Sequence, residues 1–341
     1  MNKIKELRGL VIGGGSIGER HIFNLKKMGL KKIAILDSDK KRSNHLATKY
    51  NIKNFENIES SMSFNPDFSL ICTWADSHMS LAKFCLKNNS HIFIEKPISN
   101  ESKGVKEFLK NADYKKLNIA IGYNMRFEKS LNILKKQIQE KKVGETLSIH
   151  SQWGNNIKNW IHPDKKGGHY IEKSGGGVIL DDSHEYDYVQ WLMADKIESV
   201  YCQTHVTDKS KTENLASMIM KFKGGAIASF VIDFARPRYE RFCHVISDNG
   251  DIKWNFSRTS QLKQYQTEAN SSITTQKLHV KKLHKNFSYC LNELYESEIK
   301  DFLDSIIKHR KPKVTGWDGL DTLNIGLAAL RSSKTNRAIK F

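Results

Sequence analysis

The chain has few cysteines, and they form no recognisable pattern. Its 341 residues include only five, widely scattered and without a C-x-x-C pair. An odd and dispersed set argues against a disulfide framework and against a thiolate zinc site. It is typical of a reducing compartment, so we expect a cytoplasmic protein.

Long apolar runs are also missing. No stretch approaches the roughly 18 uninterrupted apolar residues that a bilayer-crossing helix needs. The apolar run near the N-terminus ends almost at once in glycines, which is typical of a first strand and not of a signal peptide. The sequence therefore predicts no membrane partner.

Acidic residues are outnumbered, 37 against 55 lysines and arginines, and the formal net charge is +18. The lysines are spread along the chain in pairs such as Lys26-Lys27 and Lys141-Lys142. A nucleic-acid binder would instead cluster its basic residues and interleave them with aromatic ones. Dispersion favours a solvated surface, with attraction of an anionic substrate as the alternative, and predicts no nucleic-acid partner.

The first third of the chain alternates short apolar runs with amphipathic stretches, the pattern of a parallel sheet flanked by helices. The expected strands cover residues 10–12, 32–36, 68–73, 91–94 and 118–123, and the expected helices 16–28, 43–50, 77–87 and 99–110. Ser99 is the expected N-cap of the last helix. This repetition predicts an α/β fold with a Rossmann, doubly wound parallel sheet over residues 1–125.

Residues 126–341 are expected to form an α+β domain for substrate binding and oligomerisation, with a large, mostly antiparallel open sheet. The expected strands cover 146–153, 215–222, 226–234, 241–247 and 252–255, and the expected helices 130–139, 291–308 and 319–332. Lys223-Gly224-Gly225 suits a hairpin turn. The polar stretch at 257–285 shows no clear pattern.

A glycine motif, G-x-G-x-x-G, occupies residues 13–18 between the first strand and the first helix. Gly13 permits the tight turn, Gly15 lets the backbone approach a pyrophosphate, and Gly18 allows close packing of helix on strand. The exposed N–H groups and the helix dipole favour anionic phosphates. These features predict a dinucleotide site.

Asp37 ends the second strand, where its carboxylate can accept hydrogen bonds from the adenosine ribose. The same carboxylate would repel a 2′-phosphate, so NAD is the predicted cofactor. The basic run Lys40-Lys41-Arg42 lies close by and leaves NADP open as the alternative.

Lys96 follows the fourth long strand within Glu95-Lys96-Pro97. Ligands of open α/β sheets bind outside the carboxyl ends of the strands. An ammonium there can hydrogen-bond a substrate hydroxyl and exchange its proton as a hydride leaves the same carbon. The alternative is an ordinary surface lysine.

A second candidate cluster spans residues 175–187, where three glycines precede a helix that we expect to begin near Asp181 or Asp182. His184 and Asp187 are three residues apart and share a helical face. A histidine there can bind a substrate oxygen while a carboxylate fixes its tautomer. The spacing of His162, His169 and His184 does not suit a ligand set, so no metal site is predicted.

Together these motifs resemble the Gfo/Idh/MocA family of sugar and polyol dehydrogenases. The matching segments, which cover nearly the whole chain, are Gly13 to Gly18 with Arg20-His21, Thr73 to His78, Glu95-Lys96-Pro97, Gly122 to Phe127, Gly175 to Asp187, Tyr295 to Glu298 and Trp317-Asp318-Gly319.

The resemblance implies Lys96 as proton donor or acceptor and His184 near the reacting hydroxyl, with a carboxylate beside it. The family often places an aspartate four positions before the histidine, but Leu180 stands there and Asp181 follows it. Asp181, Asp182 and Asp187 therefore stay open as the substrate contact, with Asp181 the predicted catalytic partner. The remaining expected contacts are, for the cofactor, Ser16, Ile17, Arg42, Thr73, His78 and Glu95, and, for the substrate, Tyr123, Asn124, Arg126, Trp153, Tyr170 and Asp187.

The resemblance also implies a homodimer or homotetramer built on the outer face of the second sheet. Trp153, Trp160, His162 and Tyr170 are candidates for an aromatic wall against a sugar ring or a base, with sheet core as the alternative for Trp153. A weaker likeness of the Asp-x-Ser-His-Glu-x-Asp segment points to bacterial surface-glycan pathways and nucleotide sugars.

The predicted activity is hydride transfer between NAD(P) and a hydroxyl-bearing carbon of a sugar, with a nucleotide sugar as the narrower form. Two alternatives stay open. A same-fold enzyme could use transient oxidation for elimination or hydrolysis, and a protein of another class could bind the dinucleotide without catalysis.

Overall fold

The computed structural model describes residues 3–156, 176–207, 211–258, 267–278 and 283–341. By its internal contacts the chain forms two compact units, Met1–Asn124 with Tyr295–Leu323, and Met125–Leu294 with Asn324–Phe341. The first break lies beside the predicted boundary at residue 125. The segment Tyr295–Leu323, which the sequence assigned to the second domain, packs with the first unit. No described helix has the length and apolarity to cross a membrane.

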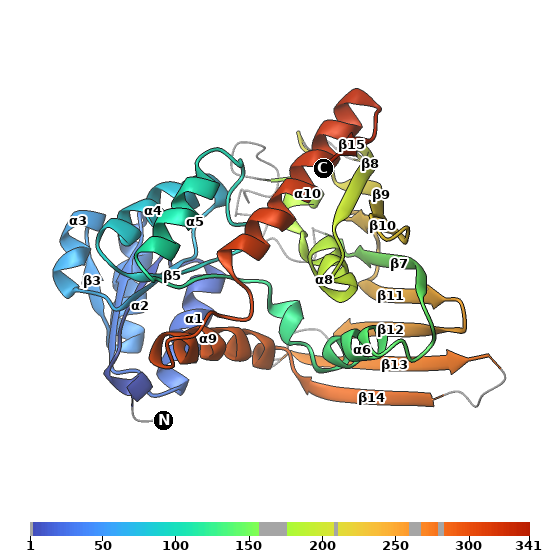
Figure 1. Ribbon diagram of the computed structural model, residues 1–341. Coiled ribbons are helices and arrows are strands. Elements are labelled where there is room, and N and C mark those ends of the chain that lie inside the picture. Colours follow the sequence, from blue (N-terminus) through green and yellow to red (C-terminus); the bar gives the residue numbers. More distant parts are fainter. Residues whose placement is uncertain (1–2, 157–175, 208–210, 259–266, 279–282) are drawn as a thin grey trace. The chain divides into compact units, whose positions relative to one another are not determined.

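A six-stranded parallel sheet forms the centre of the first unit (Figure 1). Its order, β3-β2-β1-β4-β5-β6, reverses between β1 and β4, as in a dinucleotide-binding Rossmann fold. The strands are β1 Arg8–Ile12, β2 Lys32–Leu36, β3 Lys53–Phe55, β4 Phe68–Ile71, β5 His91–Ile94 and β6 Ile119–Ile121. The central strands are buried on both faces and read as continuous apolar runs, which is why the sequence revealed them.

Helices pack on both faces of this sheet. They are α1 Ser16–Lys27, α2 Lys40–Tyr50, α3 Ile58–Ser61, α4 Ala75–Lys87, α5 Val105–Tyr114 and α9 Asn292–Ile307. Helix α9 comes from far along the chain, and its Ile299, Phe302 and Leu303 join the core of the sheet. Phe302 meets Phe68 edge to face at 5.9 Å. This apolar stripe explains why the late segment belongs to the first unit.

Three local details of this unit differ from the prediction. Helix α5 begins at Val105, because Gly104 at φ +73° breaks the helical path and the Ser99 hydroxyl accepts from the Glu101 amide in a local turn instead of capping a helix. The short strand β3 was not predicted. Helix α2 begins three residues earlier than predicted, with the Asp39 side chain accepting from the amides of Lys41 and Arg42.

The second unit contains a nine-stranded sheet in the order β14-β13-β12-β11-β7-β10-β9-β8-β15. Its neighbouring strands are antiparallel except for β7 and β10, which run parallel. The strands are β7 Thr146–Gly154, β8 Ile197–His205, β9 Leu215–Phe222, β10 Ile227–Asp233, β11 Glu240–Ser247, β12 Gly250–Arg258, β13 Glu268–Lys277, β14 Leu283–Cys290 and β15 Ile339–Lys340. The mostly antiparallel open sheet was predicted, whereas β8, β13, β14 and β15 were not.

One face of this sheet is covered by helices, and the strands alternate accordingly (Figure 1). In β9, Ala216, Met218 and Met220 are buried, while Ile219 is exposed on the opposite face. The helices are α6 Lys129–Gln139, α7 Val178–Asp181, α8 His184–Met193 and the second half of α10 Gly316–Thr335, whose residues up to Leu323 belong to the first unit. Among the described residues no helix covers the other face of the sheet, which is therefore called the open face.

Candidate active site

The glycine loop between β1 and α1 has the geometry of a phosphate cradle. Gly13 adopts φ +95°, and a Cβ there would lie 2.7 Å from the carbonyl oxygen of Cys72. A Cβ on Gly18 would lie 1.9 Å from the carbonyl oxygen of Gly13, so only glycine lets the helix approach the strand. A Cβ on Gly15 would meet nothing within 4 Å, and no side chain caps the start of α1. The open space above uncapped helix N–H groups fits a dinucleotide pyrophosphate.

Asp37 follows β2 and folds back onto the same loop. Its Oδ2 accepts from the Gly14 amide at 2.5 Å, and its Oδ1 accepts from the Asp39 amide at 2.7 Å. Arg42 from α2 pairs with Oδ2 at 3.3 Å. The predicted ribose-binding carboxylate of Asp37 thus pairs with the nearby guanidinium of Arg42 and is held against the glycine loop.

Lys96 lies two residues after the end of β5, next to the loop that follows β4. The ring of His78 ties the two loops together, since Nδ1 lies 2.9 Å from the Pro97 carbonyl and Nε2 lies 3.1 Å from the Thr73 carbonyl. Burial lowers the pKa of His78, so the neutral ring donates to one of these carbonyls. His78 was predicted as a cofactor contact. Its ring lies between the carbonyls of Thr73 and Pro97 and fixes the backbone at both positions.

The last strand of this sheet, β6, delivers Gly122, Tyr123 and Asn124. The Gly122 amide donates to the Ile94 carbonyl, continuing the ladder past the strand ends. A Cβ on Gly122 would come within 2.9 Å of Oε2 of Glu95. Tyr123 is fully buried and Asn124 nearly so. The glycine leaves the room that the Glu95 side chain occupies.

Glu95 belongs to a buried cluster that sequence reasoning did not predict as a unit. Its Oε1 lies 2.7 Å from Nε2 of His21 on α1, and Glu298 on α9 lies close to both. The nearest ligand atoms of the three side chains are within 4.8 Å of one another. One signal was available in the sequence. Glu298 stands beside Ile299 inside the apolar stripe of α9, where a charged residue is rarely buried without a partner.

In the second unit, the predicted helix at residues 181–187 is two short segments, α7 and α8, separated by Asp182 and Ser183. Asp187 is fully buried, and its two oxygens accept from Nε and Nη2 of Arg126 at 2.9 and 2.7 Å. Two predicted substrate residues are therefore joined in a bidentate ion pair. Asp181 and His184 are more exposed than Asp182 and Asp187.

Arg241 on β11 is a buried residue that the sequence did not single out. Its guanidinium lies 2.7 Å from Oε1 of Glu185 and 3.4 Å from Oδ1 of Asp182. It also lies over the ring of Trp153, at 5.8 Å from its centroid. Nothing in the local sequence around Arg241 marks it, because its partners are more than fifty residues away along the chain.

Trp153 is 3% exposed and packs edge to face on Phe234 at 5.8 Å, the packing of a sheet core residue. Tyr170, with Trp160, His162 and His169, lies outside the described residues.

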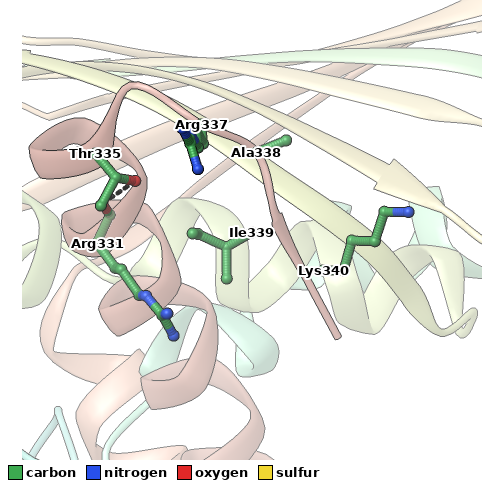
Figure 2. Close-up of a pocket in the computed structure, with 6 residues that line it drawn as sticks. All are labelled: Arg331, Thr335, Arg337, Ala338, Ile339 and Lys340. Carbon is green, nitrogen blue, oxygen red and sulfur yellow. Dashed lines mark hydrogen bonds between the residues drawn. The ribbon is translucent and has the colours of Figure 1, made fainter.

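A cavity of about 610 Å³ lies at the C-terminal end of the second unit (Figure 2). Its lining residues are Arg331, Thr335, Arg337, Ala338, Ile339 and Lys340. In Figure 2 the charged ends of Arg331 and Lys340 point in different directions, so they do not converge on one point. None of the predicted site residues lines this cavity.

Two protein-family models match the chain. The NAD-binding Rossmann fold of the Gfo/Idh/MocA oxidoreductase family matches residues 7–123, and the C-terminal alpha/beta domain of that family matches residues 135–341. A myo-inositol 2-dehydrogenase of Thermotoga maritima is 26% identical over 348 residues, which cover 97% of each chain.

Solved structures share the fold over the same length. An oxidoreductase of Agrobacterium radiobacter, solved with NAD+, L-tartaric acid and magnesium, superposes with a TM-score of 0.82 at 18% identity over 98% of both chains. A UDP-N-acetylglucosamine 3-dehydrogenase of Acidithiobacillus ferrooxidans gives 0.78 at 18% identity, over 96% of this chain and 98% of that one.

Proposed function

The chain belongs to the Gfo/Idh/MocA family of NAD-binding oxidoreductases, and we propose that it oxidises or reduces a hydroxyl-bearing carbon of a sugar or polyol, with Lys96 as general acid or base. The nicotinamide of a bound NAD supplies or accepts the hydride. The inositol dehydrogenase among the relatives supports a polyol or sugar substrate.

The position of Lys96 is the observation that carries this proposal. It follows a central parallel strand in the unit that also contains the glycine loop and Asp37. The loop ends beside it are fixed by His78, so the backbone of Lys96 is held at the edge of the sheet where ligands bind. An ammonium on this backbone can pass a proton to or from a substrate hydroxyl.

For the second unit, we propose His184 and Asp181 as substrate contacts. Asp182 and Asp187 are buried and ion-paired with arginines, whereas His184 and Asp181 are partly exposed. The Arg126–Asp187 pair then acts on α8 and the turn before α6, and holds the backbone from which His184 projects.

The substrate has two candidate classes, a free polyol and a nucleotide sugar. The inositol dehydrogenase relative supports the first, and the nucleotide-sugar dehydrogenase that shares the fold supports the second. A panel containing both classes distinguishes them, since a nucleotide-sugar enzyme loses its activity when the nucleotide is removed from the substrate.

We also propose that the chain forms a homodimer or homotetramer through the open face of the nine-stranded sheet. The register places Tyr201, Ile219 and Ile227 on that face, at 37, 49 and 46% exposure. Exposed apolar residues gathered on one sheet face are typical of a subunit contact.

Turnover by the Lys96→Ala variant tests the function. Purified wild-type protein is assayed with NAD against a panel of inositols, aldoses and nucleotide sugars, following NADH by absorbance. We expect Lys96→Ala to lose about a hundredfold or more in kcat, the usual contribution of general acid or base catalysis. The matched control is Lys103→Ala, which removes an exposed lysine of the same unit.

Undiminished turnover in Lys96→Ala would remove this lysine from the mechanism. Substrate conversion without accumulation of NADH would favour transient oxidation with elimination or hydrolysis. Binding of NAD without turnover of any substrate in the panel would favour a non-catalytic dinucleotide-binding protein.

A further inference from the structure

Arg241 is a buried charge on the covered face of the nine-stranded sheet. Along β11, Arg241, Cys243 and Val245 are buried and alternate with more exposed residues. The strand register places Trp153 on β7 and Phe256 on β12 directly opposite Arg241, one on each side. The guanidinium carbon lies 5.8 Å from the ring centroid of Trp153 and 5.9 Å from that of Phe256. Aromatic rings on two neighbouring strands therefore help to fix the position of this charge.

Two carboxylates reach this guanidinium from the segment where α7 ends and α8 begins. Nε lies 2.7 Å from Oε1 of Glu185, and Nη2 donates to Oε2 of Glu185 at 3.3 Å and to Oδ1 of Asp182 at 3.4 Å. Both acids are buried, Glu185 completely. A buried carboxylate is costly unless it is paired, and arginine can serve two at once because its donors form a planar fork. The sheet thus holds the turn between α7 and α8 through Arg241.

This turn is the place where the predicted single helix is broken. Asp182 has φ −107° and ψ 58°, which is not helical, and α8 begins two residues later. From Asp182 to Val189 every residue is buried except His184. His184 lies between the anchored residues Asp182 and Glu185. The direction in which its ring leaves the fold therefore depends on where these two carboxylates are held.

A second arginine holds the same segment from another element. Asp187 on α8 accepts from Nε and Nη2 of Arg126, at 2.9 and 2.7 Å. Arg126 belongs to the 3-10 turn Asn124–Phe127, and Sδ of its neighbour Met125 lies 3.3 Å from Nη1 of Arg241. Arg241 and Arg126 therefore hold one short segment at three positions, and they contact each other's surroundings through adjacent residues.

We propose that Arg241 is a positioning residue that holds the turn between α7 and α8 and thereby sets the direction in which His184 meets the substrate. The inference rests on the proposed function for the role of His184. All three guanidinium nitrogens of Arg241 face partners inside the fold, so its effect on turnover passes through His184. It does not pass through NAD binding, because the glycine loop belongs to the other unit.

Four variants separate the holding of this turn from general stability. Arg241→Lys keeps the buried positive charge, but an ammonium lacks the fork and the plane that stacks on aromatic rings. Asp182→Ala removes one tie to the turn, whereas Asp182→Asn keeps an oxygen that can accept from Arg241. Tyr188→Phe is the matched control, because it removes the 2.6 Å hydrogen bond between the hydroxyls of Tyr188 and Ser151 on the same helix.

For each protein, kcat, the KM for NAD and the free energy of unfolding in urea are measured. A small misplacement of a group at the reacting centre can cost up to about a hundredfold in rate, so Arg241→Lys and Asp182→Ala are expected to lower kcat about tenfold. The KM for NAD stays unchanged. Asp182→Asn keeps kcat close to wild type, and Tyr188→Phe lowers the free energy of unfolding without lowering kcat.

The same substitutions in a His184→Ala background test whether the effect passes through His184. Residues that act through one shared group have effects that do not add. Arg241→Lys and Asp182→Ala are therefore expected to lower kcat no further once the His184 ring is gone.

Amide hydrogen exchange followed by mass spectrometry measures the turn without any turnover. Exchange over residues 182–188 is expected to be faster in Arg241→Lys and in Asp182→Ala than in wild type, because the segment is less firmly held.

Three outcomes of the kinetic measurements would overturn the inference. A further tenfold loss in the His184→Ala background would show that Arg241 acts on something other than His184. A kcat of Asp182→Asn as low as that of Asp182→Ala would make the charge of Asp182, and not its tie to Arg241, the property that matters. An equal loss of kcat in Tyr188→Phe would show that any loosening of α8 slows the reaction.

A wild-type protein without turnover would refute the proposed function by itself. The exchange rates would then still decide whether Arg241 holds the turn. Faster exchange in Arg241→Lys and Asp182→Ala would support that role, and unchanged exchange in both would overturn it.

Discussion

Replacing Gly15 or Gly18 by alanine separates cofactor binding from folding. A Cβ on Gly18 would lie 1.9 Å from a backbone oxygen that cannot move without shifting the loop. Overpacking of this kind costs about 3 kcal/mol, which in a protein of this size lowers the melting temperature by about 4 °C. At Gly15 the backbone has φ −62° and ψ −174°, and the space around it is empty. The free energy of unfolding of Gly15→Ala should stay within about 1 kcal/mol of wild type.

For NAD binding, in contrast to folding, we expect the Gly15→Ala substitution to have a large effect. A methyl group in the space needed by the pyrophosphate should weaken NAD binding at least tenfold, or about 1.4 kcal/mol. At an NAD concentration a hundred times the wild-type Kd, the ligand stabilises wild type by about 2.7 kcal/mol and such a variant by about 1.4 kcal/mol. Calorimetric titration with NAD and urea unfolding with and without NAD measure both quantities. A Gly15→Ala protein that binds NAD as tightly as wild type would refute the assignment of this loop to the pyrophosphate.

Two further predictions concern the second unit. Arg126→Gln should destabilise the protein by about 3 to 5 kcal/mol in urea unfolding, because it leaves Asp187 buried without its partner, and the double variant Arg126→Met with Asp187→Leu should cost less than the single one. An equal or greater loss in the double variant would contradict this reasoning. Ile219→Asp should reduce the molecular mass measured by light scattering to that of a smaller assembly, while the control Lys103→Asp should not. An unchanged mass in Ile219→Asp would exclude this sheet face as the subunit contact.

The parallel sheet and its glycine loop could be predicted from the sequence because their signals are local. The strands of the first unit are buried on both faces, so each is a short apolar run with a helix between it and the next. The glycine loop needs glycine at positions 13 and 18 for steric reasons that involve neighbouring backbone, and its spacing is fixed by the strand and helix that flank it. The position of Asp37 could be predicted for the same reason, because this residue lies at the end of a neighbouring strand.

The edge of the second sheet gave no such signal. Strand β13 buries Ala269, Ser271, Ile273 and Thr275, a set in which small and polar residues replace the large apolar ones of a usual strand. The Ser271 hydroxyl faces inward because it donates to the buried carboxylate of Glu128. Burial along β13 alternates with a period of two, but the hydrophobicity of its residues does not show this period. Residues 257–285 could therefore not be assigned from the sequence. The placement of α9 in the first unit was hidden for a related reason, since an apolar stripe shows that a helix is buried and not against which sheet.

The roles of buried charged residues are harder still to predict from the sequence, because their chemistry depends on partners from distant segments. Glu128 and Glu298 are the same residue type, both nearly inaccessible to water, and each adjoins an apolar stripe. Their difference lies in the donors that the fold supplies, which for Glu128 come from as far away as Ser271 and Tyr289. Hydrogen-bond donors stabilise the charged form of a buried carboxyl, and burial without donors disfavours that form. The sequence can therefore predict candidate NAD contacts, but the surroundings of Glu298 follow only from the three-dimensional set of its neighbours.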